Sequence, residues 1–176
     1  MAERIYLRAL EPEDYKVSIL WRKDPEIWQM VCGPQYFVSE AYEKKWVENA
    51  IYDSSNLRLA ICIKENNQYV GNICITDINQ IYRRCTIHIM IGNKKYWGNG
   101  YAKEAVRELV EFMFNERGMN RIEARILEKH LASKKILSAC GFTMEGKLRE
   151  SVFKNGLFQN QLIYSILRED LTIYNK

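Results

Sequence analysis

The stretch that most constrains how this chain folds runs from residue 91 to residue 106, where a glycine loop joins a strand-like run to an amphipathic helix. The run before the loop, 85–91, is apolar and rich in β-branched residues, which predicts a buried or half-buried strand. After the loop, apolar residues recur at helical spacing: Ala102, Ala105, Val106, Leu109, Val110 and Met113. A helix is therefore expected over residues 101–116, with Gly118 as its stop signal.

The loop itself has the features of an anion site. Gly98 and Gly100 lack the Cβ that would keep a phosphate away from the backbone. The first N–H groups of a helix have no intrahelical partner, and the positive end of the helix dipole points at the loop. Lys94 and Lys95 add positive charge at its mouth. The spacing matches neither Gly-x-x-x-x-Gly-Lys-Ser/Thr nor Gly-x-Gly-x-x-Gly, so a tight turn that binds nothing is an equally good interpretation of the loop alone.

The rest of the chain predicts strands and helices on both sides of this unit. The predicted strands are 5–10, 57–63, 69–75 and 83–91 before the central helix, and 121–127, 142–152 and 158–168 after it. Helices are expected to open near Pro12 and at the N-cap Ser39, and a further helix is expected over 131–139. Polar turns at 65–67 and 77–80 predict an antiparallel meander. We therefore expect one α+β domain over residues 1–176, with a mixed, mostly antiparallel central sheet flanked by helices.

Two details of the N-terminal helices are predicted from side-chain character. The first helix is expected to bury Val17, Leu20 and Trp21. In the second helix, Glu40 and Glu43 precede two lysines that would repel a polycation. This charged stretch is therefore interpreted as a solvated helix face.

Composition narrows the class of protein. The 176 residues are 47% hydrophobic and 27% charged, which is typical of a globular chain. A net charge of +4 without a long basic run disfavours a nucleic-acid partner. No apolar run approaches the roughly 20 residues of a membrane span, and the N-terminus lacks the basic-then-apolar order of a signal peptide. No membrane association and a cytoplasmic location are therefore expected.

The cysteines and histidines give no sign of a metal or a disulfide framework. The five cysteines are widely spaced and lie mostly in apolar runs, which predicts buried thiols. Cys140, followed by Gly141 and Phe142, is interpreted as a structural thiol and not as an acetyl-carrying nucleophile. With two histidines and no Cys-x-x-Cys, no metal site is expected.

Residues 95–100, Lys-Tyr-Trp-Gly-Asn-Gly, resemble the pyrophosphate-binding signature of the GNAT superfamily of N-acetyltransferases, Arg/Gln-x-x-Gly-x-Gly/Ala. Three further segments follow in the order of that family. Residues 120–125 resemble its fifth strand, and residues 130–142 resemble its Asn-x-x-Ser/Ala segment with the following Gly-Phe. Residues 144–156 resemble the closing hairpin of spermidine acetyltransferases and ribosomal-protein N-terminal acetyltransferases. The resemblance covers nearly the whole chain.

This resemblance implies an enzyme that moves an acetyl group from acetyl-CoA to a primary amine by direct transfer in a ternary complex. A small amine such as a polyamine is the favoured acceptor, followed by an amino sugar, an amino acid or a protein N-terminus. It also implies a homodimer or larger homo-oligomer. The residues expected to bind the cofactor lie on the strand, on the loop and at the start of the fourth helix: Ile89, Met90, Ile91, Lys95, Tyr96, Trp97, Gly98, Asn99, Gly100, His130 and Ser133.

His88 is the candidate catalytic base. A free alkyl amine has a pKa of roughly 10, so acetyl transfer needs a group that takes its proton. The unperturbed pKa of histidine, about 6.5, suits this role. Strand alternation places His88 on one face with Thr86 and Met90, away from the most apolar row. A packed or exposed strand histidine without a role is the alternative interpretation.

The sequence departs from the family pattern at several positions. Leu137 stands where many members carry a tyrosine proposed to protonate the departing thiolate, and Thr86 stands where relatives often have a glutamate. His130 replaces an asparagine, and Lys95 replaces Arg/Gln and so loses the bidentate fork. Ser133 matches the pattern, although helix capping alone would also explain it. These departures motivate an alternative function, a catalytically silent acyl-CoA-binding sensor of the same fold.

Overall fold

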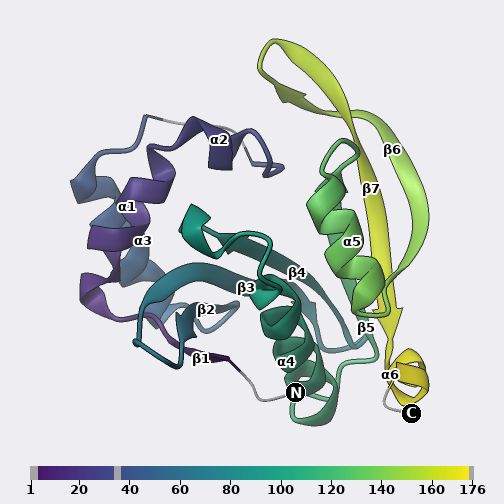
Figure 1. Ribbon diagram of the computed structural model, residues 1–176. Helices are drawn as coiled ribbons and strands as arrows, with labels where there is room; N and C mark the ends of the chain where they lie inside the picture. Colours follow the sequence, from purple (N-terminus) through teal and green to yellow (C-terminus); the bar gives the residue numbers. More distant parts are fainter. Residues whose placement is uncertain (1–3, 34–36, 175–176) are drawn as a thin grey trace.

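The computed structural model describes residues 4–33 and 37–174, which form one domain around a single seven-stranded sheet (Figure 1). Residues 1–3, which belong to the stretch that bears on a signal peptide, lie outside the described residues, as do residues 34–36 and 175–176 of the predicted domain. The strands are β1 (Ile5–Ala9), β2 (Leu57–Ile63), β3 (Tyr69–Asn79), β4 (Arg84–Ile91), β5 (Arg121–Leu127), β6 (Thr143–Lys154) and β7 (Leu157–Leu167).

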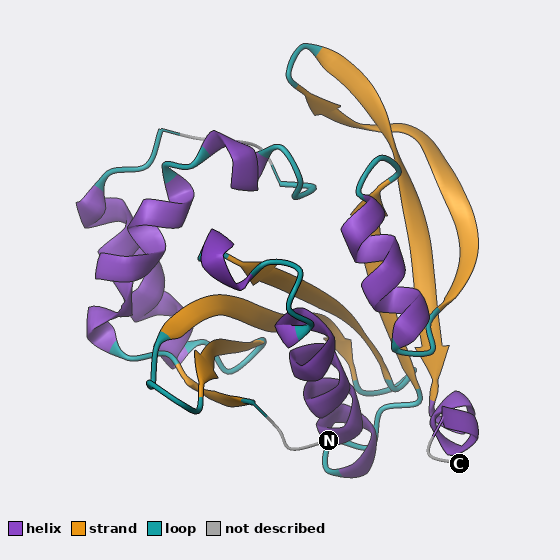
Figure 2. Cartoon of the chain, viewed as in Figure 1, coloured by secondary structure: helices purple, strands orange, loops and turns teal. Residues whose placement is uncertain are grey.

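The sheet has the order β1-β2-β3-β4-β5-β7-β6. Every neighbouring pair is antiparallel except β4 and β5, which run parallel. The α-helices, purple in Figure 2, are α1 (Tyr15–Arg22), α2 (Pro25–Trp28), α3 (Glu40–Tyr52), α4 (Tyr101–Asn115), α5 (Leu131–Ala139) and α6 (Arg168–Tyr174). The predicted α+β fold with a mixed, mostly antiparallel sheet is therefore confirmed.

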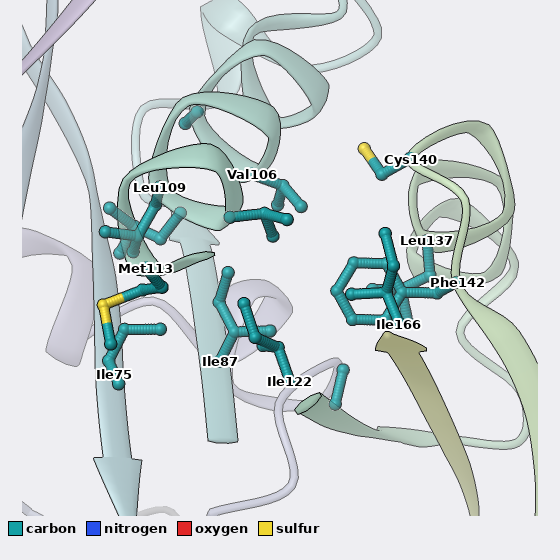
Figure 3. Packing of buried hydrophobic residues seen from close by; sticks show 14 of the residues in the cluster. Ile75, Ile87, Val106, Leu109, Met113, Ile122, Leu137, Cys140, Phe142 and Ile166 are labelled. Carbon is teal, nitrogen blue, oxygen red and sulfur yellow. The ribbon is translucent and has the colours of Figure 1, made fainter. Parts of the chain in front are cut away.

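One face of the sheet packs against α4 and α5. The apolar stripe of α4 that the sequence predicted is buried: Val106, Leu109 and Met113 are each at most 1% exposed. Figure 3 shows these side chains above Ile75 and Ile87, while Leu137 of α5 lies beside Phe142 and Ile166. This apolar layer supports the loop that precedes α4.

The opposite face of the first strands is covered by α1 and α3. Trp21 packs on Tyr69 with ring centroids 4.8 Å apart. The predicted burial of Trp21 is confirmed, but that of Val17 and Leu20 is wrong, because these side chains are 37% and 63% exposed. The buried side of α1 instead carries Tyr15, Ser18 and Ile19. Ser18 points inward, where its hydroxyl bonds a buried carboxylate of α3.

That carboxylate belongs to Glu43, which is 0% exposed. Ser18 Oγ donates to its Oε1 at 2.6 Å, and Arg22 Nε donates to its Oε2 at 2.9 Å. The interpretation of Glu43 as part of a solvated helix face is therefore wrong. Glu43 lies one turn before Val47, the fully buried residue of the same helix, so it points inward while its lysine neighbours are exposed.

Strand β3 is longer than predicted. The sequence places a turn at 77–80, whereas β3 continues to Asn79. Its pairing with β4 shifts register between Thr76 and Asn79, and Asp77 adopts a left-handed backbone with φ of 52°. This bulge extends the strand and directs Asp77 and Thr76 toward the site described below.

The parallel pair β4 and β5 separates soon after it forms. The two strands are paired only from Arg84 opposite Arg121 to Thr86 opposite Glu123. Beyond that point they diverge (Figure 1), and within the described residues no strand pairs with this edge of β4. The divergence leaves backbone donors and acceptors of β4 open in the middle of the sheet.

Candidate active site

The glycine loop ends directly at the N-terminus of α4. Gly98 and Gly100 have φ of 76° and 87°, a conformation that L side chains rarely adopt. A Cβ built on Gly98 meets nothing within 4 Å, so the space beside its backbone is open. Gly100 is the N-cap of α4 and carries no side chain to satisfy the first helical N–H groups. These groups are thus available to an anion, as the sequence predicted.

Several contacts hold the loop in this shape. Trp97 Nε1 donates to the carbonyl of Ile91 at 2.7 Å, which fastens the loop to the end of β4. The side-chain amide of Asn99 donates to the carbonyls of Trp97 and Lys95 at 3.2 and 3.4 Å. Arg4 Nη2 donates to the carbonyl of Asn99 at 2.8 Å. The loop is therefore fixed by side chains within it and by the chain before β1.

The two lysines of the loop have different surroundings. Lys94 Nζ lies 2.7 Å from Asp24 Oδ2 and 2.5 Å from Glu26 Oε2, so these carboxylates neutralise its charge. The expectation that Lys94 adds positive charge at the mouth is therefore wrong, because the acidic start of α2 lies against it. Lys95 is exposed, and its side chain makes no ion pair with the residues that the structure describes. It remains a cation that can meet a phosphate.

The two aromatic residues of the loop are mainly packing residues. The Tyr96 hydroxyl donates to Gln68 Oε1 at 2.5 Å, and its ring meets Tyr101 edge-on with centroids 5.6 Å apart. Trp97 is 38% exposed but its indole N–H is used by β4. Both therefore shape the loop, and Trp97 also offers an exposed ring at its surface.

The predicted strand residues lie on the open edge of β4. Ile89 and Ile91 pack toward the α4 side, and Met90 packs against the cluster beneath α1 and α3. Their backbone groups on the β5 side have no strand partner among the described residues. An extended chain can therefore add to this edge by main-chain hydrogen bonds.

At the start of α5, His130 and Ser133 contact each other. Ser133 Oγ lies 2.8 Å from His130 Nδ1, and His130 makes no side-chain cap hydrogen bond. The Ser133 hydroxyl therefore contacts the side chain of His130, and helix capping does not explain its position. Leu137, one turn later, is 4% exposed and packs in the core (Figure 3), so its position provides no acid.

His88 lies in a hollow of about 630 Å³ on the face of the sheet opposite α4. Its ring is accessible to solvent but has protein atoms around it. The charged and hydroxyl-bearing residues that share this hollow come from β3, β4 and β5: Asp77, Arg84, Thr86, Glu123 and Arg125. The hollow lies where β4 and β5 part, so it meets the open strand edge.

A hydrogen-bond chain orients His88. Its Nε2 lies 2.9 Å from Thr76 Oγ1, and the Thr76 hydroxyl donates to Asp77 Oδ2 at 3.1 Å. Because a hydroxyl has one proton, Thr76 accepts from the imidazole when it donates to Asp77. Nε2 then carries the proton, and Nδ1 is the free acceptor of the neutral ring.

The pKa of His88 is lowered from its usual value of 6.5. Partial burial in the hollow is the largest cause, and the positive charges of Arg125 and Arg58 act in the same direction, while Asp77 opposes them. His88 is therefore neutral at pH 7, which is the form that can accept a proton.

Asp77 and Arg125 line the site although the sequence did not predict them there. Alternation along residues 121–127 would have placed Arg121, Glu123 and Arg125 on one face, but nothing in the sequence aligned that face with His88. The sequence predicts a turn at Asp77. The position of Asp77 in the hollow depends on the bulge in β3, which the sequence does not reveal.

Other candidate groups do not contribute to this site. Cys140 is 7% exposed, and burial raises the pKa of its thiol to about 11, so it is a structural thiol as predicted (Figure 3). Within residues 4–33 and 37–174, no group of three or more His, Cys, Asp or Glu could hold a metal ion. No helix in the same ranges is long and apolar enough to cross a membrane.

Comparison with known proteins identifies the family. The sequence pattern of the acetyltransferase (GNAT) domain matches residues 4–143 of this chain. The chain belongs to the GNAT acetyltransferases. It is 30% identical over 170 residues to the uncharacterized N-acetyltransferase p20 of Bacillus licheniformis, covering 96% of this chain and 95% of the relative.

Two further comparisons involve spermidine acetyltransferases. The spermidine N(1)-acetyltransferase of Vibrio cholerae is 24% identical over 165 residues, and 91% of each chain is covered. A crystal structure of spermidine N-acetyltransferase from Vibrio cholerae, in complex with CoA and spermine, superposes with a TM-score of 0.88 at 22% identity and covers 97% of this chain and 99% of that one. This structural likeness confirms the GNAT fold.

Membership of this family confirms three predictions from the sequence. The chain is a GNAT acetyltransferase by its sequence pattern, it is an acyltransferase enzyme, and acetyl-CoA is its acyl donor. The glycine loop and the open edge of β4 fit that donor: the loop offers uncompensated backbone N–H groups and the free cation Lys95, and Gly98 leaves space where a side chain would stand.

Proposed function

We propose that this GNAT enzyme binds acetyl-CoA along the glycine loop and the open edge of β4, and that His88 accepts the proton of a primary amine during direct acetyl transfer. The observation that carries this proposal is the parting of β4 and β5 after Thr86 and Glu123. It places an unpaired strand edge between the anion loop on one side and His88 on the other.

Each part of the site has a distinct binding role. The N–H groups at the start of α4 and the Lys95 ammonium hold the pyrophosphate. The backbone of residues 89–91 pairs with the extended arm of the donor as an added strand. A β4 backbone N–H at the split donates to the carbonyl oxygen as negative charge develops there. His130, the N-cap of α5, and Ser133 in its first turn border the same arm.

The acetyl group moves in one direct displacement. The thioester is the activated acyl group: a C–N bond forms to the amine, the C–S bond breaks, and the electron pair leaves on sulfur as the thiolate. Nδ1 of neutral His88 takes the amine proton, while Thr76 holds Nε2. Leu137 supplies no proton to the thiolate, so that step has no protein acid at this position.

The acceptor is a primary amine that enters the hollow around His88. The relatives named spermidine acetyltransferases support a small amine, and a polyamine stays the prediction made from the closing hairpin. Amino sugars, amino acids and protein N-termini are the other candidate acceptors. A homodimer or larger assembly also stays a prediction.

A catalytically silent acyl-CoA sensor is the second candidate. Leu137 and Thr86 favour it, because neither can serve as the acid or the carboxylate base that the family pattern places there. A sensor would bind acetyl-CoA and leave it intact with every amine. The hydrogen-bonded His88 favours the enzyme.

The experiment is thiol release from acetyl-CoA with a panel of spermidine, amino sugars, amino acids and short peptides. His88→Gln keeps a polar group of similar length but cannot act as a base, so the rate at saturating acetyl-CoA should fall about a hundredfold or more. Acetyl-CoA binding, measured by calorimetry, should stay unchanged in this variant. Binding without turnover on any amine would instead establish the sensor.

A further inference from the structure

The hollow around His88 is lined by charged groups of both signs that form no ion pair with the residues that the structure describes. The guanidinium groups of Arg84 and Arg125 line it, and neither forms an ion pair with any residue that the structure describes. Among the described residues, the Asp77 carboxylate accepts a hydrogen bond from the Thr76 hydroxyl and forms no ion pair. Two guanidinium groups and one carboxylate therefore line the acceptor space without a direct ion pair to the residues that the structure describes.

The remaining carboxylate in the lining, Glu123, is already engaged. Arg121 Nε donates to Glu123 Oε1 at 3.0 Å, and the same guanidinium donates to both oxygens of Glu145 at 2.8 and 2.5 Å. Because Arg121 already neutralises its charge, Glu123 is less available to attract an amine. Among the described residues that line it, the hollow therefore lacks the surplus of free carboxylates that a polycation would need.

Arg125 on β5 lines the same hollow as His88 on β4. Thr86 is opposite Glu123 in the last paired position of β4 and β5. Two residues further along the same face of each strand are His88 and Arg125, which both line the hollow. The positive charge of Arg125 also contributes to the lowered pKa of His88.

From this arrangement we infer that the acceptor carries an anionic group close to its primary amine, and that Arg125 binds that group. This inference rests on the proposed function, and among the candidate acceptors it disfavours the polyamine predicted from the closing hairpin. Arg125 pairs with the carboxylate or phosphate, and Asp77 and His88 attract and deprotonate the amine. A polyamine, with positive charge along its whole length, meets the unpaired guanidinium groups instead.

The test uses pairs of acceptors in which one member carries the anion and the other a neutral group, with the same thiol-release assay and with kcat/KM expressed per concentration of neutral amine. The carboxylate arm compares phenylalanine with phenylalaninamide, and the phosphate arm compares glucosamine 6-phosphate with glucosamine. Spermidine is the polycation. The anionic member of the productive pair should have a kcat/KM about tenfold or more higher, mainly through KM. The arm that responds identifies carboxylate or phosphate as the source of the anion.

Arg125→Gln should abolish this preference, with a loss of kcat/KM about tenfold or more larger for the anionic member of the pair than for the neutral member. Arg117→Gln removes the same charge from an exposed residue after α4, outside the hollow, and should preserve the preference. A higher kcat/KM for spermidine or for the neutral members would overturn the inference while leaving the transferase intact. So would an equal loss with both members of a pair in Arg125→Gln. Silence with all acceptors would overturn the proposed function and this inference together.

Discussion

Nε2 of His88 lies 2.9 Å from the hydroxyl oxygen of Thr76, which in turn donates to Asp77. This contact joins the candidate base on β4 to a bulge in β3. When the Thr76 hydroxyl donates to Asp77, it accepts from Nε2, so the free nitrogen, Nδ1, is the one available to the acceptor amine.

Thr76→Val should therefore slow acetyl transfer. Valine preserves the branched shape but cannot accept from Nε2, so the ring loses its fixed orientation and tautomer. We expect kcat to fall up to about tenfold, the worth of one such hydrogen bond, with KM for acetyl-CoA unchanged. Thr76→Ser keeps the hydroxyl and should retain most of the rate. Equal rates for the Val and Ser variants would contradict a positioning role for Thr76.

The lowered pKa of His88 predicts a specific pH dependence. Because that pKa lies below 6.5, His88 should limit kcat/KM only at pH values below this, where the ring becomes protonated. Asp77→Asn removes the charge that stabilises the imidazolium, so the acid limb should move to lower pH. Arg125→Gln removes a charge that destabilises it, so the limb should move to higher pH. The profiles are measured with one acceptor, so the titration of its amine is the same in each variant. Shifts of both variants in the same direction would contradict the assignment of the acid limb to His88.

The glycine loop can be tested with a matched pair of substitutions. Gly98 and Gly118 both have positive φ, 76° and 64°, and a Cβ on either meets nothing within 4 Å. Alanine at each position therefore carries a similar backbone cost of about 1–2 kcal/mol. Only Gly98→Ala puts a methyl group where the pyrophosphate would approach. Its Kd for acetyl-CoA should rise about tenfold or more, whereas Gly118→Ala should bind normally; equal affinities would place the pyrophosphate elsewhere.

Lys154 links the closing hairpin to the segment after α2. Its side chain is buried, at 5% exposure, and Nζ donates to the carbonyls of Val31 and Gly33 at 2.6 Å each. Lys154→Met leaves both carbonyls without this donor and should lower the free energy of unfolding by about 1–3 kcal/mol, measured by urea denaturation. Lys154→Arg keeps the charge and donors and should recover part of the loss. An unchanged unfolding midpoint in Lys154→Met would show that water replaces the contact without cost.

The sequence predicted the scaffold well because its signals are local. Apolar alternation located the strands, and the periodic stripe of 102–113 located α4 with its buried face. The Gly98 and Gly100 pattern predicted the loop because both positions need a left-handed backbone, which glycine provides. These features depend on residues within one turn or one strand of each other.

The acceptor side was predicted poorly because it depends on distant contacts. The bulge at Asp77, the face of Arg125 opposite His88, and the neutralised Lys94 each require the relative position of elements far apart in sequence. Local propensity contains no information on these pairings. The charged residues of the hollow therefore come together only through the alignment of β3, β4 and β5, which the sequence does not reveal.

Glu43 is another residue whose surroundings depend on contacts that are distant in sequence. Its carboxylate is 0% exposed, and Arg22, which bonds it, lies between the rings of Trp28 and Trp46 at 5.1 and 4.9 Å. Arg22→Met leaves a buried carboxylate without its cation and should cost about 3–5 kcal/mol of unfolding free energy.

Replacing both partners, Arg22→Met with Glu43→Met, removes the uncompensated charge and should recover much of that loss, so the two changes are not additive. Lys45→Met on the same helix breaks only the exposed pair with Glu48 and should leave the urea midpoint nearly unchanged. Additive losses in the double variant would mean that packing against the two tryptophans, and not the buried ion pair, is what Arg22 contributes to the stability of α1 against α3.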